Sequence, residues 1–264
     1  MKRGFLKKGS VLWLIVLIGA LLLFGCDSTL LGKDDSNDGT NGGTTGGTTG
    51  GAADSVAGIW LKVFSSPYFD YDGPASSAVA EAMIMDIQGT AYTLIFYYNV
   101  EQVGGNRGTL TLSDGKLQLA VADEWNSSNY WVQAAPNTKL EFPYTISGDT
   151  LTLTVGSEQI PLTKTTFTQP NAFVGTWKAG PQTMVFYADG TFTFSDAAYI
   201  PPRTESGNWD ASGTTSGYLR KVSTKINGNN AYEGALAPYT VIDSNNIEIT
   251  FKTIPETKGI ATRQ

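Results

Sequence analysis

The chain contains no histidine, and Cys26 is the only cysteine among its 264 residues. The absence of histidine removes the usual general base, the commonest transition-metal ligand and the side chain that changes charge near neutral pH. A Ser-His-Asp triad is therefore excluded, and a zinc site would have neither histidine nor a second thiolate. Without a second cysteine no intramolecular disulfide can form, so packing must stabilise the folded part.

Basic residues are few, and several of them lie at the start of the chain. The sequence has 18 Lys and Arg against 24 Asp and Glu, and four of the basic residues precede Cys26, so the chain from Cys26 onward has a formal charge of 14 − 24 = −10. Phosphate neutralisation dominates nucleic-acid binding, so this acidic balance predicts no nucleic-acid partner. It also argues against electrostatic docking onto anionic lipid.

The first 26 residues combine a basic start with an apolar run from Val11 to Phe24, followed by Gly25 and Cys26. This order is typical of a secretory signal peptide. The alternative, a retained transmembrane helix, needs about 20 apolar residues, whereas this run has 14. The tetrapeptide Leu-Phe-Gly-Cys at 23–26 resembles the lipobox of bacterial lipoproteins, although Phe24 is bulkier than the residue usual there.

The resemblance implies a signal peptide over residues 1–25, cleavage between Gly25 and Cys26, a diacylglycerol on the Cys26 sulfur and an acylated amino group. Three acyl chains, palmitate among them, would meet the requirement of two signals for stable anchoring. We therefore expect a protein of the bacterial cell envelope, periplasmic or surface-exposed, whose Cys26 is held in membrane lipid. The membrane and leaflet are left open.

Residues 26–55 are predicted to carry the lipidated Cys26 and a disordered linker. The stretch 39–51 consists almost entirely of Gly and Thr, and such a segment cannot bury enough surface to offset its ordering entropy. A flexible coil of about 29 residues would reach roughly 30 Å. The acidic run at 34–38 is rejected as a calcium loop because its twelfth position is Thr45 rather than Glu.

From residue 55 onward, apolar and polar residues alternate in short runs, which predicts β-strands throughout. Asp114-Gly115 lies between two such runs and is a strong hairpin signal, and Asp189-Gly190 repeats it. The best helical candidate is the short segment 76–82, which adjoins a strand expected at Met83.

The second half of this region echoes the first in order. Four collinear matches are Gly58-x-Trp60 with Gly175-x-Trp177, Met83 to Gly89 with Met184 to Gly190, Gly108 with Gly207, and Pro143-Tyr144 with Pro238-Tyr239. Two copies are too few for a solenoid. We interpret them as two tandem domains, residues 56–168 and 172–264. Seven or eight expected strands in each predict a small antiparallel barrel, with a β-sandwich as the alternative.

The Gly-x-Trp starts make each unit resemble the lipocalins and the broader calycin group, most of all the short lipocalin-like domains of bacterial surface lipoproteins. The resemblance implies an all-β fold of two tandem lipocalin-like barrels. It implies a structural role at the barrel start for Gly58, Trp60, Gly175 and Trp177, with each Trp packed across a closed end. In that family a late-strand Arg often donates to this Trp, and the sequence does not identify one here.

Patterns that would support catalysis or metal binding are weak. Ser113 to Lys116 fits a Ser-x-x-Lys signature, but it lies on the expected hairpin turn. Asp70 and Asp72 could bind calcium, although Asp is an ordinary turn residue. Asp123 and Glu124 point to opposite faces of a strand, whereas a glycosidase needs two carboxylates across one sugar. We predict no enzyme activity, no metal and no cofactor.

Aromatic residues give the one positive signal for a ligand. The candidate ligand-binding residues lie near two expected loops and are Trp125, Tyr130, Trp131, Tyr68, Phe69 and Tyr71. Barrel mouths bind small molecules in apolar cavities with a few polar groups, although aromatic residues also serve sheet packing. We expect a non-catalytic protein that binds an apolar or amphipathic small molecule. The alternatives are a surface interaction or adhesion module that binds carbohydrate or protein through aromatic loops, and an enzyme limited to carboxylate or Ser/Lys chemistry.

Overall fold

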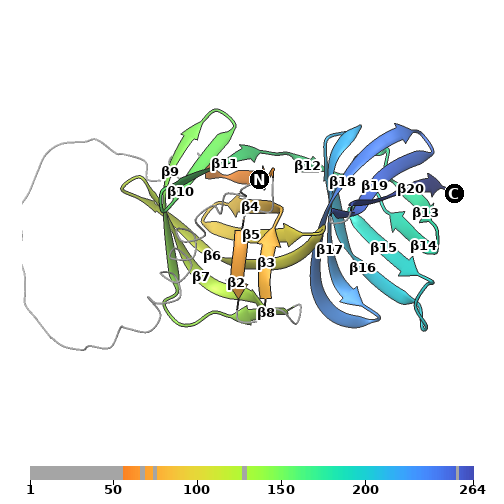
Figure 1. The fold of residues 1–264 in the computed structure, drawn as a ribbon, viewed down its shortest axis with the longest axis horizontal. Helices are drawn as coiled ribbons and strands as arrows, with labels where there is room; N and C mark the ends of the chain where they lie inside the picture. The colour runs from red at the N-terminus through yellow and green to blue at the C-terminus, as the bar shows by residue number, and fades with distance from the viewer. Residues whose placement is uncertain (1–55, 66–68, 74–75, 127–129, 254–255) are drawn as a thin grey trace, which may run out of the picture. The chain divides into compact units, whose positions relative to one another are not determined.

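The computed structural model describes residues 56–65, 69–73, 76–126, 130–253 and 256–264, which belong to one compact unit. Its regular structure consists of β-strands (Figure 1), which confirms the all-β expectation. Within these ranges no helix is both long and apolar enough to cross a bilayer. The signal peptide, Cys26 and the Gly/Thr linker lie outside the described residues.

Eight strands of the N-terminal half close into an antiparallel barrel. In the order of their pairing they are β1 (Gly58–Val63), β4 (Ala82–Gln88), β5 (Ala91–Tyr98), β6 (Glu101–Ser113), β7 (Lys116–Asn126), β9 (Lys139–Ser147), β10 (Thr150–Val155) and β11 (Glu158–Lys164). The ring closes where β11 returns to β1, with Trp60 opposite Lys164. Closure leaves these strands without an open edge.

Ten further strands of the same 18-stranded sheet lie outside this barrel. Two are short, namely β8 (Tyr130–Gln133), paired with β7, and β12 (Phe167–Thr168), paired with β16. The other eight, here called the C-terminal strand series, are β13 (Gly175–Ala179), β14 (Gln182–Phe186), β15 (Thr191–Asp196), β16 (Arg203–Ser212), β17 (Ser216–Ile226), β18 (Asn229–Asp243), β19 (Asn246–Thr253) and β20 (Glu256–Arg263). They pair in chain order, and β20 also pairs with β13.

A separate two-stranded sheet corrects the helical candidate at 76–82. Ser76–Ala80 form β3, which pairs with β2 (Phe69–Gly73), and Ala82 begins β4. A helix of two turns is marginal in water, whereas β2 pairs with β3 at each residue from Ser76 to Ala80. The hairpin at Asp114-Gly115 is confirmed: φ is +52° and +70° at these two residues, the left-handed pair that a type I′ turn requires.

Alternation along the strands places the first core inside the barrel. Leu117, Leu119, Leu151 and Leu162 are fully buried in it, and the threonines between such positions face the other side of the sheet. A second core of buried residues, including Phe186, Phe192, Trp209 and Ile249, belongs to the C-terminal strand series. Burying a side chain of this size stabilises a fold by about 1.5–3 kcal/mol.

The outer face of the barrel is apolar where it meets the C-terminal strand series. On β4, Met83 and Met85 belong to the barrel core, whereas Ala82 and Ile84 belong to a third cluster that includes Leu236 of β18. A continuous apolar run is typical of a strand covered on both faces. The two halves are therefore packed together and share one sheet.

An arginine reinforces this contact between the halves. Arg220 of β17 donates to both carboxylate oxygens of Asp210, at 2.8 and 2.5 Å, and its guanidinium lies 3.9 Å from Asp86 of β4. It also lies 4.6 Å from the ring centre of Phe167. Burial lowers the pKa of Arg220, but the neighbouring carboxylates, Asp210 first, outweigh burial and raise it.

Each half fixes the Trp of its first strand by the same hydrogen bond. Trp60 Nε1 donates to the carbonyl of Val56 at 2.8 Å, and Trp177 Nε1 donates to the carbonyl of Phe173 at 2.7 Å. Both indoles are 1 % exposed. A buried indole needs such a partner, so both Trp residues are fixed at the start of their strands.

The last strand of each half places a cation on this indole. Lys164 Nζ lies 5.4 Å from the Trp60 ring centre, and the Arg263 guanidinium lies 4.7 Å from that of Trp177. The sequence did not identify Arg263 as the partner of Trp177. Cation–π contacts of this kind contribute about 0.5–2 kcal/mol.

Replacing Trp177 with alanine should lower the free energy of unfolding by about 3–5 kcal/mol, because it removes a buried aromatic ring and its hydrogen bond. Urea titration of the full chain measures this change. Tyr187→Ala is the matched control, since that ring is 45 % exposed, and its effect should stay within about 0.5 kcal/mol. Equal losses in both variants would contradict the structural role assigned to Trp177.

Candidate functional site

The C-terminal strand series forms most of the wall of an open cavity of about 330 Å³. Its wall is formed largely by apolar side chains of β14, β15, β17 and β19, namely Met184, Phe186, Phe192, Phe194, Leu219 and Ile249. The volume is at the lower end of the range for small-molecule pockets. The cavity therefore suits a compact ligand with an apolar body.

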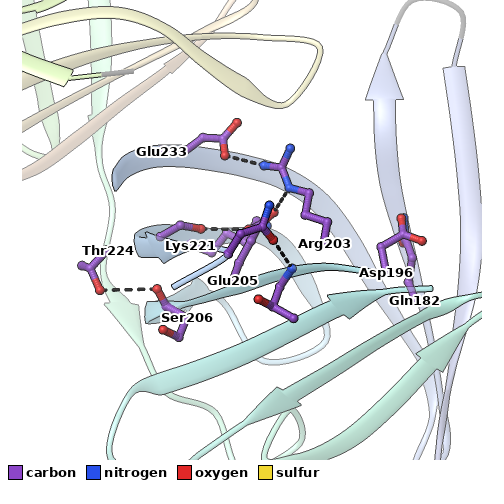
Figure 2. Close-up of polar contacts among 11 residues, drawn as sticks. Gln182, Asp196, Arg203, Glu205, Ser206, Lys221, Thr224 and Glu233 are labelled. Atoms are coloured by element: carbon purple, nitrogen blue, oxygen red, sulfur yellow. Dashed lines mark hydrogen bonds and ion pairs between the residues drawn. The ribbon is translucent and has the colours of Figure 1, made fainter. Parts of the chain in front are cut away.

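Charged side chains line one part of the same cavity. Glu205 is 6 % exposed and accepts from Lys221 Nζ at 2.6 Å, Ser223 Oγ at 2.8 Å and Arg203 Nε at 2.8 Å. Arg203 Nη2 also donates to Glu233 at 2.6 Å. Figure 2 shows Arg203 between the carboxylates of Glu233 and Glu205. A buried carboxylate is tolerated when cations and donors satisfy it in this way.

The protonation of this cluster follows from its contacts. Burial by itself raises the pKa of Glu205, but the Lys221 charge, the hydrogen bonds from Lys221 and Ser223, and Arg203 outweigh it, so the pKa is lowered. Burial lowers the pKa of Arg203, and Glu205 and Glu233 overcome that effect and raise it. Glu205 is therefore ionised, and Arg203 remains charged, at neutral pH.

Strand periodicity explains how charged residues come to lie among apolar ones. Glu205 lies two and four residues before Gly207 and Trp209 on β16, and Lys221 lies two residues after Leu219 on β17. Side chains two apart on a strand share a face, so both charges point toward the core side. A Cβ at Gly207 would lie 1.9 Å from the Val222 carbonyl, so only glycine fits where β16 and β17 approach here.

The turn between β5 and β6 of the barrel forms part of the cavity wall. Val100 packs against the second core, and its carbonyl accepts from Leu236 N at 2.8 Å. Glu101 pairs with Ala235 and also lines the cavity. Val100 has φ +66°, which costs a β-branched residue about 1–3 kcal/mol. Both halves of the chain therefore build the cavity.

The structure places Trp125 and Trp131 outside this cavity. Trp125 is 5 % exposed and packs edge-on against Trp131, with ring centres 5.5 Å apart. Tyr130 begins β8, and Phe69 and Tyr71 lie on β2, whereas Tyr68 lies outside the described residues. Their role in ligand binding stays a prediction.

Trp131 lies in a groove of about 430 Å³ between the barrel and the C-terminal strand series. The Arg107 guanidinium lies 4.8 Å from the Trp131 ring centre and pairs with Asp123 at 2.7 Å. Gln102 and the half-exposed Tyr232 also line this groove. It presents the aromatic rings of Trp131 and Tyr232 together with several polar groups.

The weaker catalytic candidates are not brought together. Ser113 Oγ donates to the neighbouring Asp114 at 3.2 Å, while Lys116 Nζ pairs with Glu141 at 3.2 Å. Asp123 pairs with Arg107 rather than facing Glu124. Among the residues the structure describes, no group of three or more Cys, Asp or Glu is arranged to hold a metal ion.

A scan of the chain against protein-family models gives no match, and a search of curated proteins also gives none. The geometry of the cavity is therefore the basis for a functional proposal.

Replacing Glu205 with glutamine should reduce the stability of the protein and flatten its pH dependence in acid. Because folding lowers the pKa of Glu205, its contribution is fully present above the unfolded pKa of about 4.3 and is lost as pH falls through the folded pKa. Above about pH 6 the variant should be less stable by about 1.5–3 kcal/mol, since the partly exposed Lys221 and Arg203 both lose the charged acceptor that they share. Chemical denaturation between pH 3 and pH 7 measures this, and parallel curves at every pH would contradict it.

Proposed function

We propose that the protein is a non-catalytic, membrane-tethered lipoprotein of the bacterial cell envelope that binds an apolar or amphipathic small molecule. The observation that carries the binding proposal is the cavity of about 330 Å³ in the C-terminal strand series. Its apolar walls suit a hydrocarbon or aromatic body, and its charged part offers fixed polar groups. Pockets that bind small molecules combine these two features.

The proposal includes two tandem lipocalin-like barrels, one in each half of the chain. Four features that the halves share support it. The last strand returns to the first in both, β20 to β13 and β11 to β1, and the Trp of each first strand donates the same hydrogen bond. The glycines two residues before these Trp residues, Gly58 and Gly175, have φ values of +134° and +136°. In addition, Gly108 and Gly207 both lie where a Cβ would meet a neighbouring carbonyl within about 2 Å, at 2.0 and 1.9 Å. The domain boundaries at 168 and 172 are part of this proposal.

Filling the cavity should abolish ligand uptake. Ala235 lines the cavity, so Ala235→Phe should weaken binding of the neutral fluorescent probe N-phenyl-1-naphthylamine by about tenfold or more, because the new ring takes the place of the ligand. Fluorescence titration of the full chain measures the affinity, and native mass spectrometry detects any molecule that is retained on purification. A melting curve of the variant establishes that it is folded.

Trp131→Ala distinguishes a second candidate function, a surface module that holds carbohydrate or protein in the groove beside Trp131. If the cavity is the site, this variant should bind the probe as the unsubstituted protein does. If uptake falls with Trp131→Ala and persists with Ala235→Phe, the groove is the binding site and the cavity proposal is wrong. Trp125→Ala is a poor test of the groove because Trp125 is buried.

Lipid attachment is tested at Cys26. We expect the mature protein to begin at Cys26 and to carry the mass of a diacylglycerol and an amide-linked acyl chain, and Cys26→Ser to release the protein from membranes, because the acyl chains supply the anchoring free energy. Mass spectrometry and detergent phase partition measure these outcomes, with Ser28→Ala as the control. A leader that remains uncut would overturn the lipoprotein assignment.

A further inference from the structure

The charges that line the cavity do not balance. The acidic residues are Glu101, Asp196, Glu205 and Glu233, and the basic ones are Arg203 and Lys221, so the formal charge is 2 − 4 = −2. Both cations are already engaged, Lys221 by Glu205 and Arg203 by Glu205 and Glu233. An anionic ligand would have to displace one of these carboxylates, and breaking such a buried pair is costly.

Asp196 is the buried carboxylate without a cation. It is 6 % exposed, and it accepts from Gln182 Nε2 at 3.1 Å and from the backbone N–H of Ala198 at 2.9 Å. Both donors are neutral, and no Lys or Arg of the described ranges pairs with it. Buried charges in proteins are normally compensated by an opposite charge. A cationic ligand in the cavity would supply this compensation to Asp196.

Two other groups lie on the same cavity. Thr250 is 6 % exposed and lines it. Glu101 reaches it from the β5–β6 turn, and its carboxylate pairs with no cation of the described chain. The Thr250 hydroxyl can accept a hydrogen bond from a ligand, and Glu101 adds a second negative charge from the other half of the molecule.

We propose that this cavity selects an organic cation: a primary ammonium carried on a compact aromatic or aliphatic body. The inference rests on the proposed function and names the ligand class of the same site. The ammonium lies against Asp196 and donates to Thr250, while the apolar body packs on Phe192, Phe194 and Ile249. Ammonium groups are also attracted to aromatic faces, of which this wall offers several.

Three ligands with one shared body test the charge preference: 4-phenylbutylamine, 4-phenylbutan-1-ol and 4-phenylbutanoate. Calorimetric titration of the full chain near neutral pH should show the amine binding about tenfold or more tightly than the alcohol, since a buried charge-assisted hydrogen bond is worth at least that factor. The acid should bind weakest. Equal affinities would overturn the charge preference and leave the cavity function standing, and no binding by any of the three would overturn both.

Asp196→Asn removes the charge and keeps the shape of the side chain. It should weaken amine binding about tenfold while the alcohol changes by less than about twofold. The matched control is Asp149→Asn. Asp149 is exposed on the β9–β10 turn and does not line the cavity, so this variant removes the same formal charge and should leave both affinities unchanged. If Asp196→Asn does not fold, Glu101→Gln on the exposed turn should still weaken amine binding about two- to threefold. If the affinity for the amine is unchanged in both Asp196→Asn and Glu101→Gln, the proposal that these carboxylates select the cation is wrong.

Discussion

The pairing of a last strand with a first strand is the constraint on which the rest of this structure depends. The chain has no second cysteine, so no covalent link holds its ends in place. In the barrel the return of β11 to β1 takes over this task, and in the C-terminal strand series β20 returns to β13. At both places a buried indole with a bonded N–H is opposite a cationic residue. In each half the strand pairing that closes the sheet and the packing of the buried indole therefore involve the same residue pair.

Buried charge has two different roles in this fold. At the contact between the halves, Arg220 joins Asp210 and approaches Asp86, which ties β17 to the outer face of the barrel. In the cavity, Glu205 holds two cations in place. Isolated buried ions are expensive, and in both clusters the expense is offset by several short hydrogen bonds. One cluster positions the halves, and the other shapes the charged part of the cavity.

Much of the fold follows from the sequence because strand alternation and turn chemistry are local. The β class, the Asp114-Gly115 turn and the buried state of Trp60 and Trp177 were all predictable. The segment 76–82, the best helical candidate in the sequence, is a strand over Ser76–Ala80 because its partner strand β2, rather than its own composition, decides its conformation. The contact between the halves was missed because the apolar outward positions of β4, such as Ile84, have meaning only once a second surface covers them.

The candidate site was less accessible to sequence reasoning. The sequence favours aromatic residues near expected loops as the binding site, whereas Trp125 is buried and packs against Trp131. The sequence signal for the cavity was a charged residue that shares a strand face with core residues. Glu205 shares a face with Trp209 on β16, and Lys221 shares a face with Leu219 on β17. That signal depends on knowing which face of each strand is inside. The contribution of Val100 could not be read from the sequence at all, since it arises from tertiary packing.

The wall at Val100 and Glu101 also bears on how such a chain can evolve. A gene that exchanged its first half for an unrelated module would supply no β5–β6 turn to cover the cavity, and it would leave Leu236 uncovered. The halves must therefore be inherited as a pair, and changes in the turn of one are constrained by the cavity wall of the other. A likeness between the sequences of the two halves does not make either half separable.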